Sequence, residues 1–383
     1  MSSDTKAAIG ILATWCIGFS GVAVEPLWIS IVVSEAGLSD AVAGRIDALQ
    51  VGCVGIASLF IAPRMAKVDR RILAYFGIVL LIFAYFISAI YPGFVLFIVS
   101  RAIAGIAEGI LLSVSHAAVA ATRKPDQLFS IAFLMLILYG ILVYRFVPPL
   151  AASHGLFGVF GIVVIIAIVG APLIWLLPRT VPDTIKTEGV GIVPLNITAI
   201  CALLATCLFY LAQGGLWAYL MRIGEGVGLS KVEVGNFISY SLIFAMAGAI
   251  TAFTLRDRIG HQLPVCVGLF LLCGAALMLG TANNGNTFFI AAALQQTVGF
   301  FVMIYFASLL ASLDPLGRIV AASIAFRSLG STSGPAVVGY TVTGNDYTMA
   351  GWATFSAYAL SLILMLIALS YTRKNSQAGS YKP

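Results

Sequence analysis

The sequence predicts an all-α membrane protein with twelve transmembrane helices, and its composition, its apolar runs and its basic residues all support that fold class. Hydrophobic residues make up 61% of the 383 residues and charged residues only 9%. A soluble globular chain carries about 25% charged residues, and a single soluble core stops growing at about 250–300 residues. The hydrocarbon of a lipid bilayer must therefore solvate much of this apolar surface.

Twelve apolar runs are long enough to span a membrane, which requires about 20 residues. Six lie in the first half, at 8–33, 42–62, 72–91, 95–121, 128–152 and 156–177, and six in the second, at 194–221, 232–254, 263–282, 287–311, 318–342 and 348–371. They predict an N-terminal six-helix bundle over 1–178 and a C-terminal six-helix bundle over 194–375. The polar segment 179–193 is expected to be a cytoplasmic linker, and 376–383 a disordered tail.

The lysine and arginine residues predict the orientation of the chain. Fifteen of the 21 fall in segments on the same side as the N-terminus, and only Arg222 and Lys231 fall in loops on the other side. Because basic residues concentrate on the cytoplasmic side, both termini are expected to be cytoplasmic in a plasma (inner) membrane. The same short basic clusters argue against nucleic acid as a partner, despite the net charge of +6.

Twelve spans with a midpoint loop on the side of both termini resemble the major facilitator superfamily, whose members fold as two six-helix bundles. The family carries a G-x-x-x-D-R-x-G-R-R loop after its second helix and an echo of it after its eighth. The echo is present here, and the first copy is degenerate, with Pro63 at the position of the aspartate. The resemblance assigns a gating-loop role to Arg64, Lys67, Asp257, Arg258 and Gly260.

Two shorter motifs add to the resemblance. Arg101 and Gly105 in the fourth span are similar to the R-x-x-x-G pattern of proton-coupled members. Gly330, Gly334 and Pro335 in the eleventh span are similar to the G-x-x-x-G-P run that drug–proton antiporters carry in helix 5. Helix 5 of this chain lacks that run, so the subfamily stays open.

Ionisable side chains within the predicted spans are the strongest signal of function. Each costs at least about 2.5–3.5 kcal/mol at a helix centre, so it tends to face a partner or water. Four positive and three negative residues predict mutual pairing with one arginine left over; they are Glu25, Arg45, Asp47, Arg101, Glu108, Arg145 and Arg327. Arg45 and Asp47 lie near the outer end, where snorkelling to the interface is the alternative to a functional role.

Proton coupling is assigned to Glu25, Glu108, Arg101 and Asp47. Glu25 precedes Pro26, which frees a backbone carbonyl, and a carboxyl group there could bind a proton reversibly. Arg101 and Glu108 are seven residues apart and share one helix face. The alternative for Arg101 is a structural ion pair within the N-terminal bundle.

Substrate binding is assigned to two arginines and to a set of uncharged polar and aromatic residues. Arg327 lies about 13 Å along its helix from Arg318, near the midplane, and no carboxylate of its half lies at similar depth. A guanidinium binds a carboxylate bidentately, so Arg327 and Arg145 predict an organic anion. Helices that line the central cavity in the resembled family add Trp28, Gln213, Trp217, Gln295, Gln296 and Tyr305. Interhelical hydrogen bonding, at about 0.6 kcal/mol each, is the alternative for this set.

No cofactor, metal ion or enzymatic site is expected. The six cysteines lie inside apolar runs and form no C-x-x-C pair, and no metal-ligand spacing links the three histidines. No G-x-x-x-x-G-K-[ST] loop occurs, which argues against ATP-driven transport.

The resemblance and the buried charges together predict a monomeric, proton-coupled secondary transporter of a small organic molecule that works by alternating access. Two alternatives remain open. One is an exporter of hydrophobic or cationic compounds, and the other is a transport-inactive receptor or scaffold with the same fold.

Overall fold

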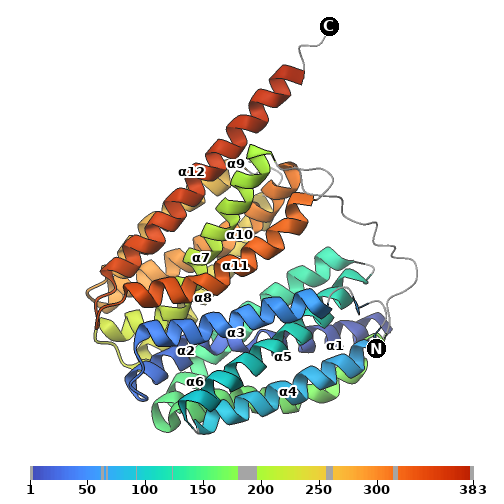
Figure 1. Ribbon diagram of the computed structural model, residues 1–383, viewed down its shortest axis with the longest axis vertical. Coiled ribbons are helices and arrows are strands. Elements are labelled where there is room, and N and C mark those ends of the chain that lie inside the picture. The colour runs from blue at the N-terminus through green and yellow to red at the C-terminus, as the bar shows by residue number, and fades with distance from the viewer. Residues whose placement is uncertain are drawn as a thin grey trace. The chain divides into compact units, whose positions relative to one another are not determined.

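The computed structural model describes residues 3–61, 64–65, 68–91, 93–122, 124–179, 196–255, 262–313 and 318–379. The regular elements of these ranges are helices (Figure 1). In chain order they are α1 (Ser3–Gly18), α2 (Ser20–Ser34), α3 (Asp40–Ile61), α4 (Arg70–Ile90), α5 (Phe94–Ala120), α6 (Pro125–Gly170), the 3-10 helix η2 (Ala171–Leu176), α7 (Ile197–Gly226), α8 (Lys231–Leu255), α9 (Gln262–Gly280), α10 (Gly285–Leu313), α11 (Arg318–Thr341) and α12 (Thr348–Gly379).

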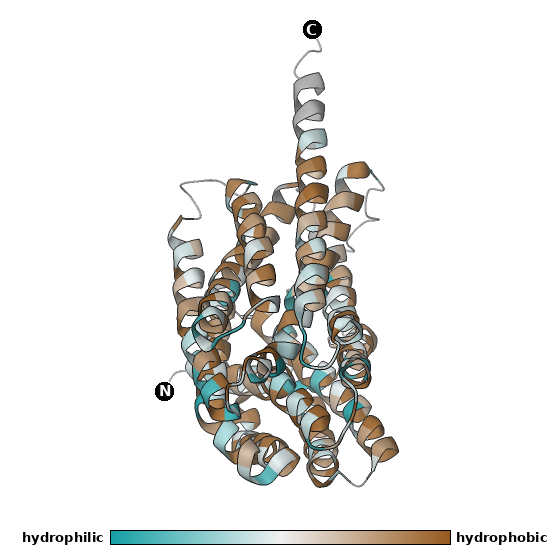
Figure 2. Cartoon of the chain, turned by 90° about the vertical axis from the view of Figure 1, so that its left-hand side faces the viewer, coloured by the Kyte–Doolittle hydropathy of each residue, from teal (hydrophilic) through white to brown (hydrophobic). Residues whose placement is uncertain are grey.

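Ten stretches of the described residues are long and apolar enough to cross a membrane. The stretch 127–176 is 50 residues long and bends at Gly155, whose φ of 54° and ψ of −136° are not helical. The sequence predicts a loop there, between two spans. The helix α11 is not among the ten, because its 24 residues include two arginines and several serines. These features are consistent with twelve spans, and the hydropathy colouring shows how apolar the helices are (Figure 2).

The described residues form two compact units. Unit 1 contains α1 to α6 and η2, together with residues 231–239 at the start of α8. Unit 2 contains α7, the rest of α8 and α9 to α12. Most of the predicted linker and the last four residues lie outside the described ranges, and α12 continues past Ser376 to Gly379.

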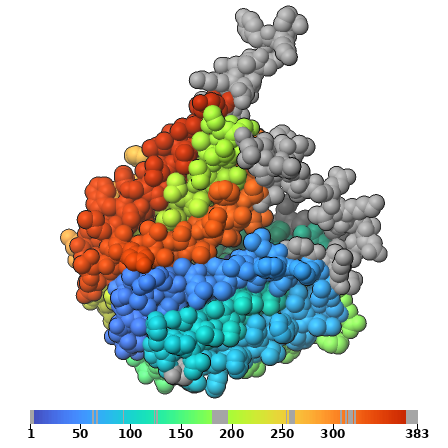
Figure 3. All heavy atoms as spheres, viewed as in Figure 1, coloured from blue at the N-terminus to red at the C-terminus, as the bar shows by residue number. Residues whose placement is uncertain are grey.

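The helix α4 illustrates how the pattern of apolar residues sets the outer face of unit 1. Its N-terminus is capped by Asp69, whose Oδ1 accepts from the backbone N–H groups of Arg71 at 2.8 Å and Ile72 at 3.4 Å. Large apolar side chains that recur at helical spacing are each more than half exposed: Ile72, Phe76, Val79, Phe83 and Phe86. The atoms of α4 lie at the surface in Figure 3. Such a continuous apolar stripe is stable against lipid and would be costly against water.

Glycines let two pairs of helices approach closely, one pair in each unit. A Cβ added to Gly105 of α5 would lie 2.2 Å from the backbone oxygen of Gln50 in α3. A Cβ on Gly330 or Gly334 of α11 would lie 2.2 Å or 2.3 Å from backbone oxygens of α7. The Gly330–Gly334 motif is therefore a helix-packing contact in this chain, as small residues are in many membrane helices.

Candidate functional site

A buried polar cluster lies within unit 1, on the facing surfaces of α2, α3 and α5. It comprises Glu25, Asp47, Gln50, Arg101 and Glu108, each 5% exposed or less. Asp47 and Gln50 are three residues apart on α3, and Arg101 and Glu108 are seven apart on α5, so each pair shares one face of its helix. Gly105, between the last two, brings the α5 backbone against α3 at Gln50. The predicted proton-coupling residues therefore meet in one site.

Glu108 is held by donors from two other helices. Gln50 Nε2 lies 3.1 Å from each of its carboxyl oxygens, and the hydroxyl of Tyr85 on α4 donates to Oε1. A Cβ on Gly21 of α2 would lie 2.1 Å from the same oxygen, so the carboxyl group also lies against the α2 backbone. Two donor groups on different helices therefore fix the position of this carboxyl group.

Arg101 is fully buried and is held by an amide and by aromatic rings. Its Nε donates to Gln50 Oε1 at 3.0 Å, NH2 donates to the same oxygen, and NH1 lies 3.4 Å from Ser88 Oγ. Its Cζ lies 5.1, 4.9 and 4.7 Å from the ring centres of Trp28, Tyr85 and Phe160. Each of these distances allows a cation–π interaction.

The prediction of mutual pairing among the buried charges was wrong for Arg101. Within the described part of the chain, it forms no ion pair with a carboxylate closer than 4 Å, and Gln50 lies between it and Glu108. The amide suits both neighbours, because its oxygen accepts from the guanidinium while its NH2 group donates to the carboxyl.

Asp47 does not snorkel to the interface, so that alternative was wrong for this residue. It is 1% exposed, and its carboxyl group lies close enough to that of Glu25 to interact with it directly. Arg45, two residues earlier, is exposed and donates from Nε to the backbone oxygen of Ala41 at 3.1 Å. The residues differ because positions two apart point to different sides of a helix.

The charges of the cluster do not balance when every group is ionised. Three carboxyl groups face one guanidinium, so the cluster would carry a net charge of −2. Burying uncompensated charge costs several kcal/mol, and a proton on one carboxyl group removes part of that cost. Two carboxyl groups in contact, as at Glu25 and Asp47, can share one proton. The arrangement is suited to binding and releasing protons.

Unit 2 holds a second, uncharged cluster. Gln295 Nε2 donates to Gln213 Oε1 at 3.0 Å, and it lies 2.7 Å from the hydroxyl of Tyr358, which donates to Gln213 Oε1 at 2.8 Å. Gln295 Oε1 and Gln296 Nε2 are buried and have no hydrogen-bond partner among the described residues. These two amide groups could bind a hydroxyl, carboxyl or amide group of a ligand.

The other predicted binding residues are dispersed. Arg327 is exposed, and its Cζ lies 4.7 Å from the ring centre of Tyr210 on α7. Arg145 is exposed beside the ring of Phe146 at 5.9 Å. Trp217 is half-buried one turn from Gln213, and Tyr305 is buried with its ring centre 4.8 Å from that of Phe301. Trp28 belongs to the Arg101 site in unit 1.

The predicted gating loops are only partly described. Arg64 is exposed and donates to the backbone oxygen of Phe60. Lys67, Asp257, Arg258 and Gly260 lie outside the described residues.

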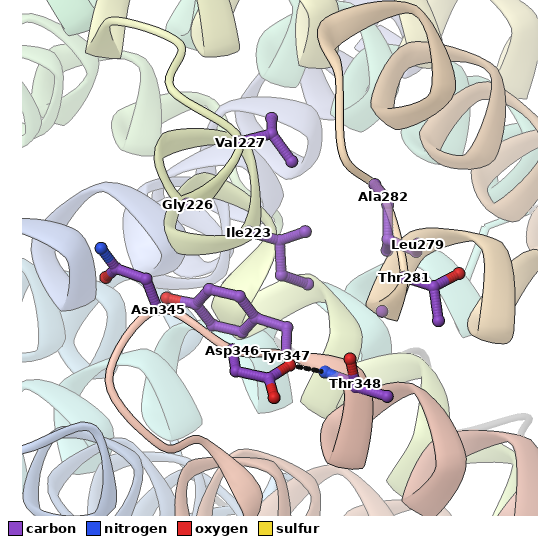
Figure 4. Close-up of a pocket in the computed structure, with 11 residues that line it drawn as sticks. Ile223, Gly226, Val227, Leu279, Thr281, Ala282, Asn345, Asp346, Tyr347 and Thr348 are labelled. Atoms are coloured by element: carbon purple, nitrogen blue, oxygen red, sulfur yellow. Dashed lines mark hydrogen bonds between the residues drawn. The ribbon is translucent and has the colours of Figure 1, made fainter.

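Two cavities among the described residues are lined by none of the predicted site residues. A cavity of about 110 Å³ in unit 2 lies between the ends of α7 and α9 and the start of α12 (Figure 4). Its wall includes Tyr347 and Asp346, whose Oδ1 accepts from Thr348 N at 2.8 Å. The volume is smaller than the about 300–1,000 Å³ of small-molecule pockets.

Sequence reasoning missed the uncharged residues that connect the charged ones. Gln50, Tyr85 and Phe160 touch Arg101 or Glu108, and Tyr358 joins the two glutamines of unit 2. The available signal for Gln50 was its spacing of three residues from Asp47, which puts both on one face.

Comparisons with known proteins agree with the helical architecture. The model of the Major Facilitator Superfamily matches residues 10–335. No curated protein matches the sequence. Solved structures with similar folds include a bacterial homologue of the human lysosomal transporter Spinster in an inward-facing, occupied conformation, at 15% identity and a TM-score of 0.71, covering 97% of this chain and 96% of that one.

Two further structures show the same likeness. A D-xylose–proton symporter is 15% identical, with a TM-score of 0.74 and coverage of 95% of this chain and 97% of that chain. The human organic anion transporter MFSD10 (TETRAN) is 17% identical, with a TM-score of 0.68 and coverage of 96% and 100%. At these identities the likeness concerns the fold alone.

Proposed function

Because the chain belongs to the Major Facilitator Superfamily, we propose that it is a proton-coupled secondary transporter of a small organic anion. The family consists of transporters, so the chain is an integral multi-pass membrane protein and not an enzyme. The coupling ion and the substrate class are the proposed part. Transport proceeds by alternating access, with both termini in the cytoplasm.

The observation that carries the proton coupling is the buried cluster of unit 1. Three carboxyl groups and one guanidinium lie together, each nearly inaccessible, and their charges do not cancel. A protonation change at Glu108 would alter what Gln50 Nε2 faces, and the amide oxygen of the same residue holds Arg101. Gln50 would thereby couple the protonation of Glu108 to the position of Arg101. The guanidinium of Arg101 also lies against three rings, those of Trp28 on α2, Tyr85 on α4 and Phe160 on α6.

The substrate class rests on the cation of unit 2. Arg327 lies against Tyr210 and has no ion-pair partner among the described residues. Its guanidinium cannot lose its proton, so an anionic group of a ligand would compensate its charge. The amide groups of Gln295 and Gln296 would add uncharged hydrogen bonds to the same class of ligand.

One observation favours the export of cationic compounds instead. The unit 1 cluster has more carboxyl groups than guanidinium groups, so an organic cation could replace the proton there. The two functions predict opposite ligand charges. Thermal unfolding of the purified protein, measured against matched panels of carboxylates and quaternary amines, separates them because a ligand raises the stability of the state it binds.

The coupling is tested in proteoliposomes with an anion found by that screen. Glu25→Gln and Glu108→Gln should abolish accumulation driven by an inward proton gradient, while exchange without a gradient should persist. Glu233→Gln, an exposed carboxyl in the first turn of α8, is the matched control and should behave as wild type. Undiminished uphill transport in both single variants and in the double variant would rule out these carboxyl groups as the proton carriers.

A further inference from the structure

A cavity of about 550 Å³ lies at one end of unit 1, and no residue of the buried cluster lines it. Its wall is formed by Lys6 in the first turn of α1, by Arg71 in the first turn of α4, by Trp175 and Leu176 at the end of η2, and by the two residues that follow η2. Positive-inside reasoning predicts that this end faces the cytoplasm. The cavity therefore opens at the depth where membrane helices meet the headgroup layer.

An aromatic ring and a guanidinium form the centre of this wall. Arg71 Nε donates to the backbone oxygen of Leu177 at 2.6 Å, and its Cζ lies 5.1 Å from the ring centre of Trp175. Arg179 Cζ lies 6.0 Å from the same ring. Trp175 is nevertheless 61% exposed, as is typical of tryptophans at a membrane interface.

The cations of the cavity are not neutralised by the protein. The terminal nitrogens of Arg71 and the ammonium of Lys6 have no hydrogen-bond or ion-pair partner among the described residues. Two acids lie near this wall in the sequence, and both are engaged. Asp69 caps α4 through Oδ1, and its Oδ2 lies 3.9 Å from Arg179. Asp4 precedes Lys6 by two residues on α1 and has an interaction of its own. The residues that line the cavity thus include two cations and no acid.

Apolar surface continues from the cavity along the same unit. Ile72 and Phe76 follow Arg71 on α4, and Val169 and Leu173 precede Trp175 on α6 and η2; all four are exposed. A small soluble anion would not contact these apolar residues. Acyl chains would cover it, and about 25 cal/mol is gained for each Å² of apolar area removed from water.

We propose that this cavity binds the headgroup of an anionic phospholipid, with the phosphate between Lys6 and Arg71 and the glycerol region against Trp175. Phosphate suits the guanidinium, which offers parallel N–H donors, and the ammonium adds a point charge. The acyl chains extend along the exposed apolar residues of α4 and α6. A bound lipid would tie the starts of α1 and α4 to η2.

The test is the affinity of the purified full-length protein for phosphatidylglycerol and for phosphatidylcholine with identical acyl chains, measured by native mass spectrometry from detergent micelles. Phosphatidylglycerol should bind more tightly. Lys6→Gln and Arg71→Gln should each weaken it about fivefold, and the double variant about 30-fold, because each basic residue near an anionic membrane surface contributes comparably. Lys124→Gln, an exposed basic residue expected at the same end but outside the cavity, should leave the affinity unchanged.

Three outcomes would overturn the proposal. The first is equal affinity for the two lipids. The second is wild-type affinity in Lys6→Gln; this variant is decisive if Arg71→Gln fails to fold, since Lys6 is exposed and forms no hydrogen bond or ion pair with a described residue. The third is complete displacement of phosphatidylglycerol by millimolar inorganic phosphate, which would identify the ligand as a soluble anion.

Discussion

Replacing Gln50 by leucine should destabilise unit 1, because two buried charged groups would lose the same partner. Arg101 would lose the acceptor that lies 3.0 Å from its Nε, and Glu108 would lose a donor that lies 3.1 Å from both its oxygens. Hydrogen bonds to charged groups contribute about 1.5–3 kcal/mol each in soluble proteins. Interhelical hydrogen bonds in membranes average about 0.6 kcal/mol.

The larger of these two hydrogen-bond energies applies here, because Arg101 is 0% exposed and cannot lose its proton. The rings of Trp28 and Tyr85 and the Tyr85 hydroxyl remain as partial compensation. We therefore expect the free energy of unfolding to fall by about 2–4 kcal/mol. This range lies between the energy of one hydrogen bond to a charged group and the cost of removing one partner of a buried ion pair.

The assay is reversible unfolding of the purified protein in mixed micelles titrated with sodium dodecyl sulfate. Gln127→Leu, which removes an exposed glutamine at the start of α6, is the matched control. Gln50→Glu is a second variant: it keeps an acceptor for Arg101 but places a further carboxyl group beside Glu108, and it should shift the pH dependence of transport. If Gln50→Leu and Gln127→Leu unfold with equal free energies, Gln50 does not bridge the two charges and the coupling route through it is refuted.

Three further predictions concern other parts of the chain. Gly105→Ala should lower the free energy of unfolding by about 1–3 kcal/mol through overpacking, because the added Cβ would lie 2.2 Å from a backbone oxygen of α3. The control is Gly161→Ala, whose added Cβ meets nothing closer than 4.0 Å; it should cost much less in the same unfolding assay. Arg327→Lys should weaken binding of the anionic ligand by about 1–3 kcal/mol and Arg327→Ala by more, measured by calorimetry, and wild-type affinity in both would remove the support for an anion. Hydrogen bonds from the hydroxyl and amide of Thr348 lower the pKa of Asp346, so the stabilisation is fully present above the unfolded-state pKa of about 3.9 and is lost as pH falls through the folded-state pKa. Asp346→Asn should therefore unfold at a lower temperature than wild type at pH 6, the difference should narrow toward pH 3, and a constant difference would contradict this.

The neutral amide cluster of unit 2 contrasts with the charged cluster of unit 1. Gln213, Gln295 and Tyr358 hydrogen-bond to one another without a charge, so protonation cannot switch them near neutral pH. Under the proposed function, we expect unit 1 to respond to protons and the amide cluster of unit 2 to contribute ligand contacts. Substitution of Tyr358 or Gln295 should then change ligand affinity without changing how transport depends on the proton gradient.

The spacing of residues along a helix predicted which charged groups share a face. Arg101 and Glu108 were expected on one face of their helix, and Gln50 does contact both. Depth along a helix did not predict burial. Arg45 and Asp47 lie at nearly the same expected depth, but Asp47 is buried, because its side of α3 faces α2 and α5 while Arg45 faces outward.

Motif spacing had a similar limit. The Gly330–Gly334 run was linked to a motif of antiporters, yet both glycines lie against the α7 backbone. A pair of small residues four apart makes a flat helix surface whatever the function of the protein. Whether such a surface packs against another helix depends on the helix that faces it, which here is α7.

The sequence by itself determined the membrane environment, the helical class and the identity of the charged residues within the spans, because the lengths of apolar runs and the cost of burying charge are properties of the chain and the bilayer. Only the tertiary structure decided the partners of those charges. Arg101 is compensated by an amide and three rings and not by a carboxylate, and the amide, the phenol and the rings come from α2, α3, α4 and α6. Such contacts join residues that are 50 or more positions apart in several cases, and no local period in the sequence carries that information.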